Sequence, residues 1–217
     1  MTNVGVPPVV DGTIHTTTSA GIRIRIFVDF WNFTLGLKAQ NSAFRADWSK
    51  IGPLFAQKAC DRISPGSTAI YEAMHVYGSF DESKDAGLRN WFTNFLDKQA
   101  GVHVEVVPRQ KKRNPPKCPS CHEPVSTCPE CGSDMRGTEE KGVDTRIVTD
   151  MIKLAWANAY DAAILVTADR DFVPVAEFLQ TKGIKVIHGA FPPGGSILSQ
   201  KCWGHIDIPN FMSEFSR

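Results

Sequence analysis

Long apolar runs and a strong net charge are both missing from this chain of 217 residues. No run approaches the ~18 apolar residues that cross a membrane, so the sequence predicts no membrane partner. The first residues do not place a basic segment before an apolar one, so we expect no secretory signal. With 24 basic and 23 acidic side chains the net charge is +1, and any attraction to nucleic acid has to be local.

Cysteine is scarce as well, because six residues in a chain of this length are too few for a disulfide scaffold. Four of them form two Cys-x-x-Cys pairs, Cys118 with Cys121 and Cys128 with Cys131. Such pairs are typical of a closed structural Zn²⁺ site, with redox-active thiols as the alternative. Thiols that bind metal indicate a reducing compartment, so we predict a cytoplasmic protein.

Apolar runs and helical patterns alternate along most of the chain. Short apolar or alternating runs predict strands at residues 22–28, 68–77, 102–108, 162–166 and 183–187. Amphipathic stretches between them predict helices at residues 47–63, 85–100, 141–157 and 173–180. Strands separated by helices form βαβ units, which predicts an α/β fold with a mostly parallel sheet. We expect one domain over residues 21–217, a flexible tail at 1–20, and a zinc-binding insertion at 110–139 that interrupts the domain.

Acidic side chains stand where two predicted strands end. Asp29 follows the first strand directly, and Asp169 and Asp171 follow strand 162–166 at the start of a helical pattern. Ligands of open α/β sheets bind at the carboxyl ends of strands, and a buried acid costs free energy unless it is paired or metal-bound. Helix capping is the alternative interpretation for these aspartates. Asn32 lies one helical turn after Asp29, where it reaches the same spot or is a solvated turn residue.

A further acid is expected on the inner face of helix 141–157. The residues three, four and seven positions after Asp144 are apolar and share its helical face. Asp144 therefore belongs at the edge of the stripe that packs on the sheet, beside the strand ends. Asp150 lies about a third of a turn around the helix. It either flanks the same cleft or faces solvent.

A basic run precedes the first cysteine pair and consists of Lys111, Lys112, Arg113 and Lys117. It is either a loop that grips phosphates or a solvated linker. A closed four-cysteine site has no open coordination position, so its zinc is expected to be structural. His122 follows the first pair and is either a substitute ligand or a bystander.

Taken in order, these motifs resemble the NYN domain, in the LabA-like branch of the PIN-like nuclease superfamily. The resemblance covers about residues 22 to 210 and rests on Phe27-Val28-Asp29 with Asn32, on Lys141-Gly142-Val143-Asp144 with Asp150, and on Asp169-Arg170-Asp171-Phe172 with Pro174. It implies a Rossmann-like three-layer α/β/α sandwich and Mg²⁺- or Mn²⁺-dependent cleavage of RNA. It also implies an acidic metal cluster of Asp29, Asp144, Asp169 and Asp171, supported by Asn32, with Asp150 as a further candidate.

The residues and the resemblance together predict a metal-dependent endoribonuclease that hydrolyses RNA phosphodiester bonds. Single-stranded or structured RNA is the expected partner, and acceptance of DNA and homodimer formation are left open. The alternative is a non-catalytic module of the same fold, which holds RNA or a protein through the zinc insertion and the basic run. An aspartyl phosphatase is disfavoured because it needs a second Asp two residues after Asp29, where this chain has Trp31.

Overall fold

A computed structural model describes residues 21–217, and the tail predicted at residues 1–20 lies outside that part. Its centre is a six-stranded parallel sheet with the order β3-β2-β1-β6-β7-β8. Counted along the chain, this is the doubly wound order in which the winding direction switches between β1 and β6. The strands are β1 (Ile22–Asp29), β2 (Ala69–Phe80), β3 (Val102–Pro108), β6 (Ala162–Val166), β7 (Lys185–Ala190) and β8 (Gly204–Asp207).

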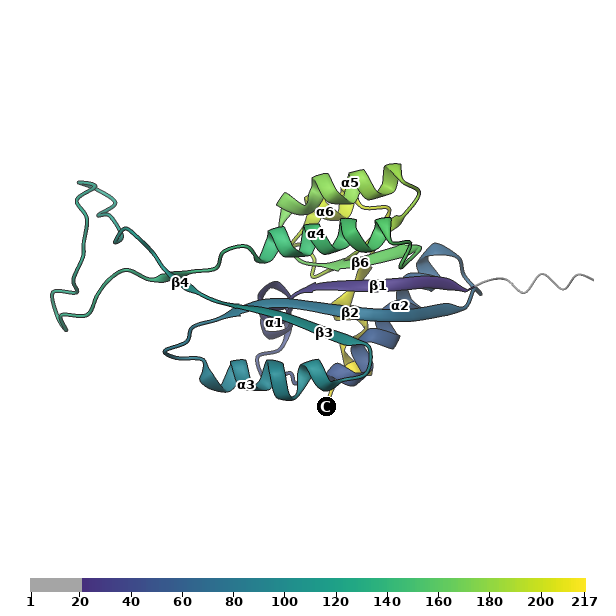
Figure 1. Ribbon diagram of the computed structural model, residues 1–217, viewed down its shortest axis with the longest axis horizontal. Coiled ribbons are helices and arrows are strands. Elements are labelled where there is room, and N and C mark those ends of the chain that lie inside the picture. Colours follow the sequence, from purple (N-terminus) through teal and green to yellow (C-terminus); the bar gives the residue numbers. More distant parts are fainter. Residues whose placement is uncertain (1–20) are drawn as a thin grey trace, which may run out of the picture.

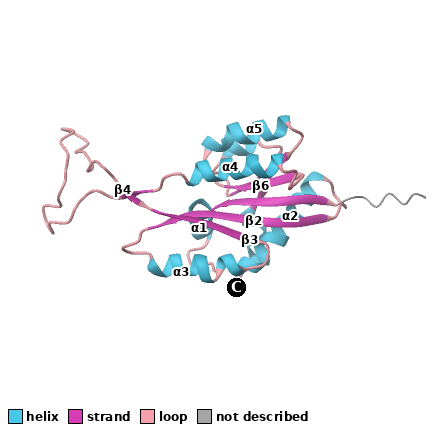
Figure 2. Cartoon of the chain, viewed as in Figure 1, coloured by secondary structure: helices cyan, strands magenta, loops and turns pink. Residues whose placement is uncertain are grey.

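Helices cover both faces of the sheet, as the predicted α/β/α sandwich requires (Figures 1 and 2). One layer contains α1 (Phe30–Gln40), α2 (Trp48–Ile63), α3 (Ala86–Asn94) and the 3₁₀ helices η1 (Leu96–Lys98) and η3 (Ile208–Phe215). The other contains α4 (Val143–Trp156), η2 (Arg170–Phe172), α5 (Val173–Thr181) and α6 (Ser196–Lys201). No helix in the described part of the chain is long and apolar enough to cross a membrane.

Two hydrophobic cores follow from the alternation of side chains along the strands. Ile24, Ile26 and Val28 of β1 lie in the core beneath α1 and α2, while Phe27 lies in the core beneath α4. Successive residues of a strand point to opposite faces of the sheet, so one strand supplies both cores. β6 is buried along its whole length, which explains why it is an unbroken apolar run in the sequence.

β2 runs three residues past its predicted end to Phe80, and two more predicted elements end elsewhere in the structure. The helix expected at 85–100 stops at Asn94, because the carboxylate of Asp97 instead accepts a hydrogen bond from the backbone N–H of Val104 at 3.0 Å. β7 continues past its predicted end to Ala190, because its last residues are buried and paired with β8. Both differences depend on contacts between elements, which local sequence patterns do not contain.

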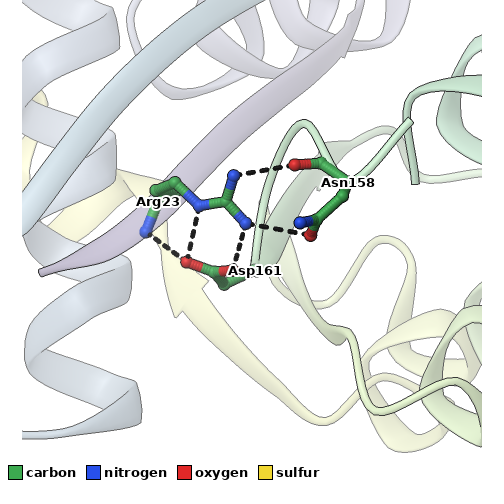
Figure 3. Close-up of polar contacts among 3 residues, drawn as sticks. All are labelled: Arg23, Asn158 and Asp161. Carbon is green, nitrogen blue, oxygen red and sulfur yellow. Dashed lines mark hydrogen bonds and ion pairs between the residues drawn. The ribbon is translucent and has the colours of Figure 1, made fainter. Parts of the chain in front are cut away.

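An ion-pair network joins the amino end of β1 to the segment just before β6 (Figure 3). Arg23 Nη2 lies 2.6 Å from Asp161 Oδ1, and Arg23 Nε donates to Asp161 Oδ2 at 3.1 Å. Arg23 Nη1 also donates to the carbonyl oxygen of Asn158 at 2.7 Å. These bonds fix the start of β6 beside the start of β1. They lie roughly 20 Å from the other end of β1, at ~3.3 Å per residue.

Residues 110–139, the segment expected to be an insertion, leave the sandwich as an extended arm (Figure 1). At its base, β4 (Gln110–Lys111) and β5 (Thr138–Glu139) pair in antiparallel fashion. The arm follows β3 and returns to the start of α4. Its base therefore lies at the same edge of the sheet as the end of β1.

Candidate active site

Asp29 ends β1 and caps α1, and its side chain is almost completely buried, with 4% of the residue exposed. The backbone N–H of Asn32 donates to Asp29 Oδ1 at 3.1 Å, and the Asn32 amide donates to Oδ2 at 2.5 Å. The hydroxyl of Thr167 donates to Oδ2 at 3.3 Å. A carboxylate offers about four acceptor positions. These bonds therefore orient Asp29 and still leave it able to accept one more partner.

Asn32 and Thr167 also tie the end of β1 to the segment after β6. The backbone N–H of Ala168 donates to Asn32 Oδ1 at 3.2 Å, and that of Asp169 donates to the Thr167 hydroxyl at 3.2 Å. Asp169 in turn caps η2, because its Oδ1 accepts the backbone N–H of Asp171 at 2.9 Å. The capping interpretation is therefore confirmed for Asp29 and Asp169, and their role in a metal cluster stays a prediction. The two strand ends meet at the switch point of the sheet, where doubly wound folds bind ligands.

Asp144 adds a third element to this group from the first turn of α4. Partial burial raises the pKa of Asp144, although its side chain stays open to solvent on one side. The negative charges of neighbouring carboxylates raise this pKa further, and these belong to Asp29, Asp169, Glu140 and Asp171. Like charges and burial both disfavour the ionised form of an acid. Acids that are distant in the sequence thus lie close enough for their charges to act on Asp144, and we call this group of acids the acidic pocket.

Glu140 and Thr167 are members of this site to which the sequence patterns assigned no role. Glu140 is brought in by the base of the arm, where it accepts a hydrogen bond from Ser79 Oγ. Ser79 is fully buried near the end of β2, and Arg109 Nη1 donates to its hydroxyl at 3.3 Å. Two features of the sequence could have identified these residues. Glu140 lies just before Lys141, and Thr167 follows a buried strand directly.

A buried histidine supports the segment after β6. His188 Nε2 lies 2.6 Å from the carbonyl oxygen of Thr167, and His188 Nδ1 lies 2.6 Å from Ser199 Oγ. Burial lowers the pKa of His188, so the ring is neutral at pH 7. A carbonyl can only accept, so Nε2 carries the proton and Nδ1 accepts from the serine. Gly195 makes room for this ring, because a Cβ there would lie 2.7 Å from it.

Asp150 lies in neither of the two surroundings that the sequence left open. Its Oδ2 accepts a hydrogen bond from the hydroxyl of Tyr77 at 2.8 Å. Burial and then the carboxylate of Asp150 raise the pKa of this tyrosine. The bond of Asp150 ties α4 to β2, and Asp150 takes no part in the hydrogen bonds that join Asp29, Asn32, Thr167 and Asp169.

The acidic pocket is not a closed metal-binding cage. Among residues 21–217, no three His, Cys, Asp or Glu side chains converge closely enough to hold a metal ion. Mg²⁺ usually keeps several water ligands and takes only one or two carboxylates from a protein. The donor set fits such an ion, because Asp29 has acceptor capacity left and the charge of Asp144 is opposed by its neighbours.

The two cysteine pairs share one backbone geometry. In the first pair, Cys118 N–H donates to the carbonyl of Glu123 at 2.8 Å, and His122 N–H donates to the carbonyl of Cys118 at 2.9 Å. The second pair repeats both bonds ten residues later, with Gly132 in the place of His122. Both residues have a positive φ, 61° and 70°. His122 thus occupies a turn position, and each pair closes a tight turn, which we call a knuckle.

The predicted basic run is exposed on the arm. Lys112, Arg113 and Lys117 are open to solvent, as is Lys111. Lys111 Nζ also forms an ion pair with Asp134 Oδ2 at 2.7 Å, which links the two sides of the arm. The run is therefore accessible to a partner.

Comparisons with known proteins agree with this fold. A search of curated proteins found no match. The chain is similar to the crystal structure of a protein of unknown function from Vibrio parahaemolyticus, with 17% identity and a TM-score of 0.53 over 92% of this chain and 99% of that chain. At this identity the similarity shows the fold alone. The NYN domain model matches residues 23–208. This chain therefore belongs to the NYN domain family, which is part of the PIN-like nuclease superfamily.

Proposed function

We propose that this protein is a metal-dependent endoribonuclease of the LabA-like branch, which hydrolyses RNA phosphodiester bonds at the acidic pocket. Family membership supports nuclease chemistry. The observation that carries the proposal is the meeting of Asp29 and Asp169 at the adjacent ends of β1 and β6, which Asn32 and Thr167 tie together by hydrogen bonds. Burial raises the pKa of Asp144, and this side chain lies close enough for their charges to raise it further. Such a concentration of negative charge is stabilised by a bound cation. Its position at the switch point of the sheet is where this fold class binds its ligands.

In this proposal one or two of the carboxylates of Asp29, Asp144 and Asp169 would bind Mg²⁺ or Mn²⁺ directly, and the others, with Asp171, would act through its water ligands. A bound ion of this kind supplies an activated water and neutralises the charge that develops on the phosphate. Asn32 holds the Asp29 carboxylate in one orientation through two hydrogen bonds, so the ligand is positioned before the substrate arrives. Asp171 is exposed in the first turn of η2 and orients water toward the phosphate.

The test is cleavage of RNA in Mn²⁺ by the wild type and by Asp29→Asn and Asp169→Asn. Both changes keep the side-chain shape and remove a charge, so we expect each to lower cleavage by about 100-fold or more. Asp150→Asn is the matched control, because this residue pairs with Tyr77 outside the pocket. Cleavage that survives both active-site changes would reject the proposal. RNA binding without any turnover would favour the alternative, a non-catalytic binding module.

We also propose that the two knuckles together bind one structural Zn²⁺. Their common geometry supports this, and backbone donors lower the pKa of Cys118, which favours the thiolate that binds metal. The ion would draw the four sulfurs together and order the arm, so that Lys111, Lys112, Arg113 and Lys117 face RNA phosphates. Thiolates of this kind persist in a reducing compartment, so we propose a cytoplasmic location.

The zinc proposal is tested by metal analysis and by the double change Cys118→Ser with Cys128→Ser. We expect about one zinc per freshly purified chain and its loss in the variant. Amide hydrogen exchange should accelerate in residues 110–139 and stay unchanged in the sheet. Fresh protein without zinc, or exchange that accelerates throughout the sheet, would contradict the proposal.

A further inference from the structure

An apolar pocket opens beside the acidic pocket, between α1 and the turn that follows β7. Its volume is about 340 Å³, within the ~300–1,000 Å³ range of small-molecule sites. Leu35 and Ala39 of α1 line one side, and Phe191 and Pro193 line the other. The residues that end β6, Val166–Ala168, also line it. We call this the α1 pocket.

The aromatic wall of the α1 pocket is fixed in place. A Cβ at Gly36 would lie 2.5 Å from the ring of Phe191, so glycine is what allows this ring to lie against α1. The ring also packs against Phe33, with 6.0 Å between the ring centroids. Leu35 stands across the pocket as an apolar side chain that is 59% exposed. The pocket thus presents a rigid aromatic face and an accessible aliphatic one.

The α1 pocket is continuous with the acidic pocket, because two side chains belong to both. Asn32 lines the α1 pocket and donates to Asp29 Oδ2 at 2.5 Å. Thr167 also lines it and donates to the same oxygen at 3.3 Å. The α1 pocket therefore adjoins Asp29, where the proposed function brings the phosphate of the RNA.

We propose that the α1 pocket binds one unpaired nucleobase of the RNA, next to the bond that is cleaved. The inference rests on the proposed function, which brings RNA to Asp29. A base has apolar faces and a polar edge, and proteins read single-stranded RNA by stacking the faces on aromatic rings and bonding the edge. Phe191 and Leu35 contact the faces, while the amides of Asn32 and Gln40 line the same pocket and reach the edge.

This assignment narrows the substrate class. A base inside a duplex is stacked between its neighbours, and its edge is occupied by its partner. Such a base has to leave the helix before it can enter a pocket, which costs a few kcal/mol. The substrate is therefore single-stranded RNA or an unpaired loop, and an RNA duplex should be bound and cut poorly.

The test uses short RNAs that carry the fluorescent base 2-aminopurine at one position at a time. They are bound to Asp169→Asn in the presence of Mn²⁺, so that RNA is held without being cut. Stacking on Phe191 should quench the fluorescence at a single position, beside the bond that the wild type cleaves. An added Ala39→Phe change fills the pocket from the exposed face of α1 and should abolish this quenching. It should also weaken RNA binding roughly ten-fold.

Ser42→Phe is the matched control, because it places the same ring on the exposed surface just beyond α1 and should change neither signal. Equal quenching at every position, quenching that persists in Ala39→Phe, or equal binding of a duplex would overturn the inference. Loss of a protein dimer in Ala39→Phe, with RNA binding unchanged, would assign the pocket to a second copy of the chain and likewise overturn it. Quenching at one position without cleavage by the wild type would refute the ribonuclease and leave the base pocket standing.

Discussion

Replacing Asp144 by asparagine should stabilise the protein without metal and weaken its response to Mn²⁺. At neutral pH the Asp144 carboxylate is held among four others, and both burial and their charges oppose its ionisation. Asparagine keeps the shape and removes the charge. Removing a proposed metal ligand also lowers the affinity for the ion, so the same change acts in opposite directions in the two conditions.

The magnitudes follow from the exposure of the site and the size of the chain. Interactions between partly exposed charges are worth about 0.2–1 kcal/mol, and 1 kcal/mol shifts the Tm of a chain of this size by about 2–4 °C. Asp144→Asn should therefore raise the Tm of the metal-free protein by about 1–3 °C. Mn²⁺ at 100 times its Kd stabilises the folded state by about 2.7 kcal/mol, or about 5–11 °C. A variant that binds ten-fold more weakly gains only about 1.4 kcal/mol.

The assay is thermal unfolding in EDTA and in Mn²⁺, with Asp150→Asn as the control that should keep the full response to the ion. The pKa of Asp144 is higher in the folded state than in the unfolded one. Its destabilising effect is therefore present above the folded pKa and disappears as the pH falls below the ordinary value of about 3.9. The difference in Tm between Asp144→Asn and the wild type in EDTA should therefore disappear as the pH falls over that range. A lower Tm for Asp144→Asn in EDTA, or equal Mn²⁺ shifts for both proteins, would refute the reasoning.

Two further predictions concern residues outside the site. Burial and then neighbouring positive charges lower the pKa of His75 to about 4, so its NMR titration should have a midpoint near 4. The unfolded chain takes up this proton first as the pH falls below about 6.5, so His75 should weaken the fold in acid; a midpoint near 6.5 would contradict this. Arg23→Ala should lower the Tm and leave RNA cleavage unchanged, because its network lies at the far end of β1. The hydrogen bond from Arg23 lowers the pKa of Asp161, so this stability should be lost as the pH falls through that lowered pKa. An equal loss of Tm at every pH, or a loss of cleavage by the folded variant, would argue against the assignment.

The strands and most helices could be predicted because their signals are local. β6 is a short, fully buried apolar run, and the structure gives it the predicted bounds, Ala162–Val166. Asp29 and Asp169 could be singled out for the same reason, since each follows such a run. Their convergence could not be read from the pattern, because it depends on β1 and β6 being neighbours in the sheet. Only the resemblance to a known family implied that these acids form one cluster.

The supporting residues of the site were not predictable from single positions. Glu140 matters because Ser79 holds it at the end of a different strand. His188 matters because its ring reaches the backbone of Thr167 from β7. Asp150 kept two interpretations because its angle around α4 is compatible with both, and only the position of Tyr77 on β2 decides its partner. These contacts join segments that are far apart in the chain, and no periodicity encodes them.

The short antiparallel pairing of β4 with β5 makes the arm structurally independent of the NYN domain. This pairing holds the two ends of the arm together before the chain enters α4. The domain is therefore joined to the same two residues of the arm, whatever sequence forms the tip. Lengthening a loop whose ends are already joined costs little, about 0.6 kcal/mol for each doubling. The tip of the arm can therefore be exchanged for another segment while the NYN domain at its base keeps its fold.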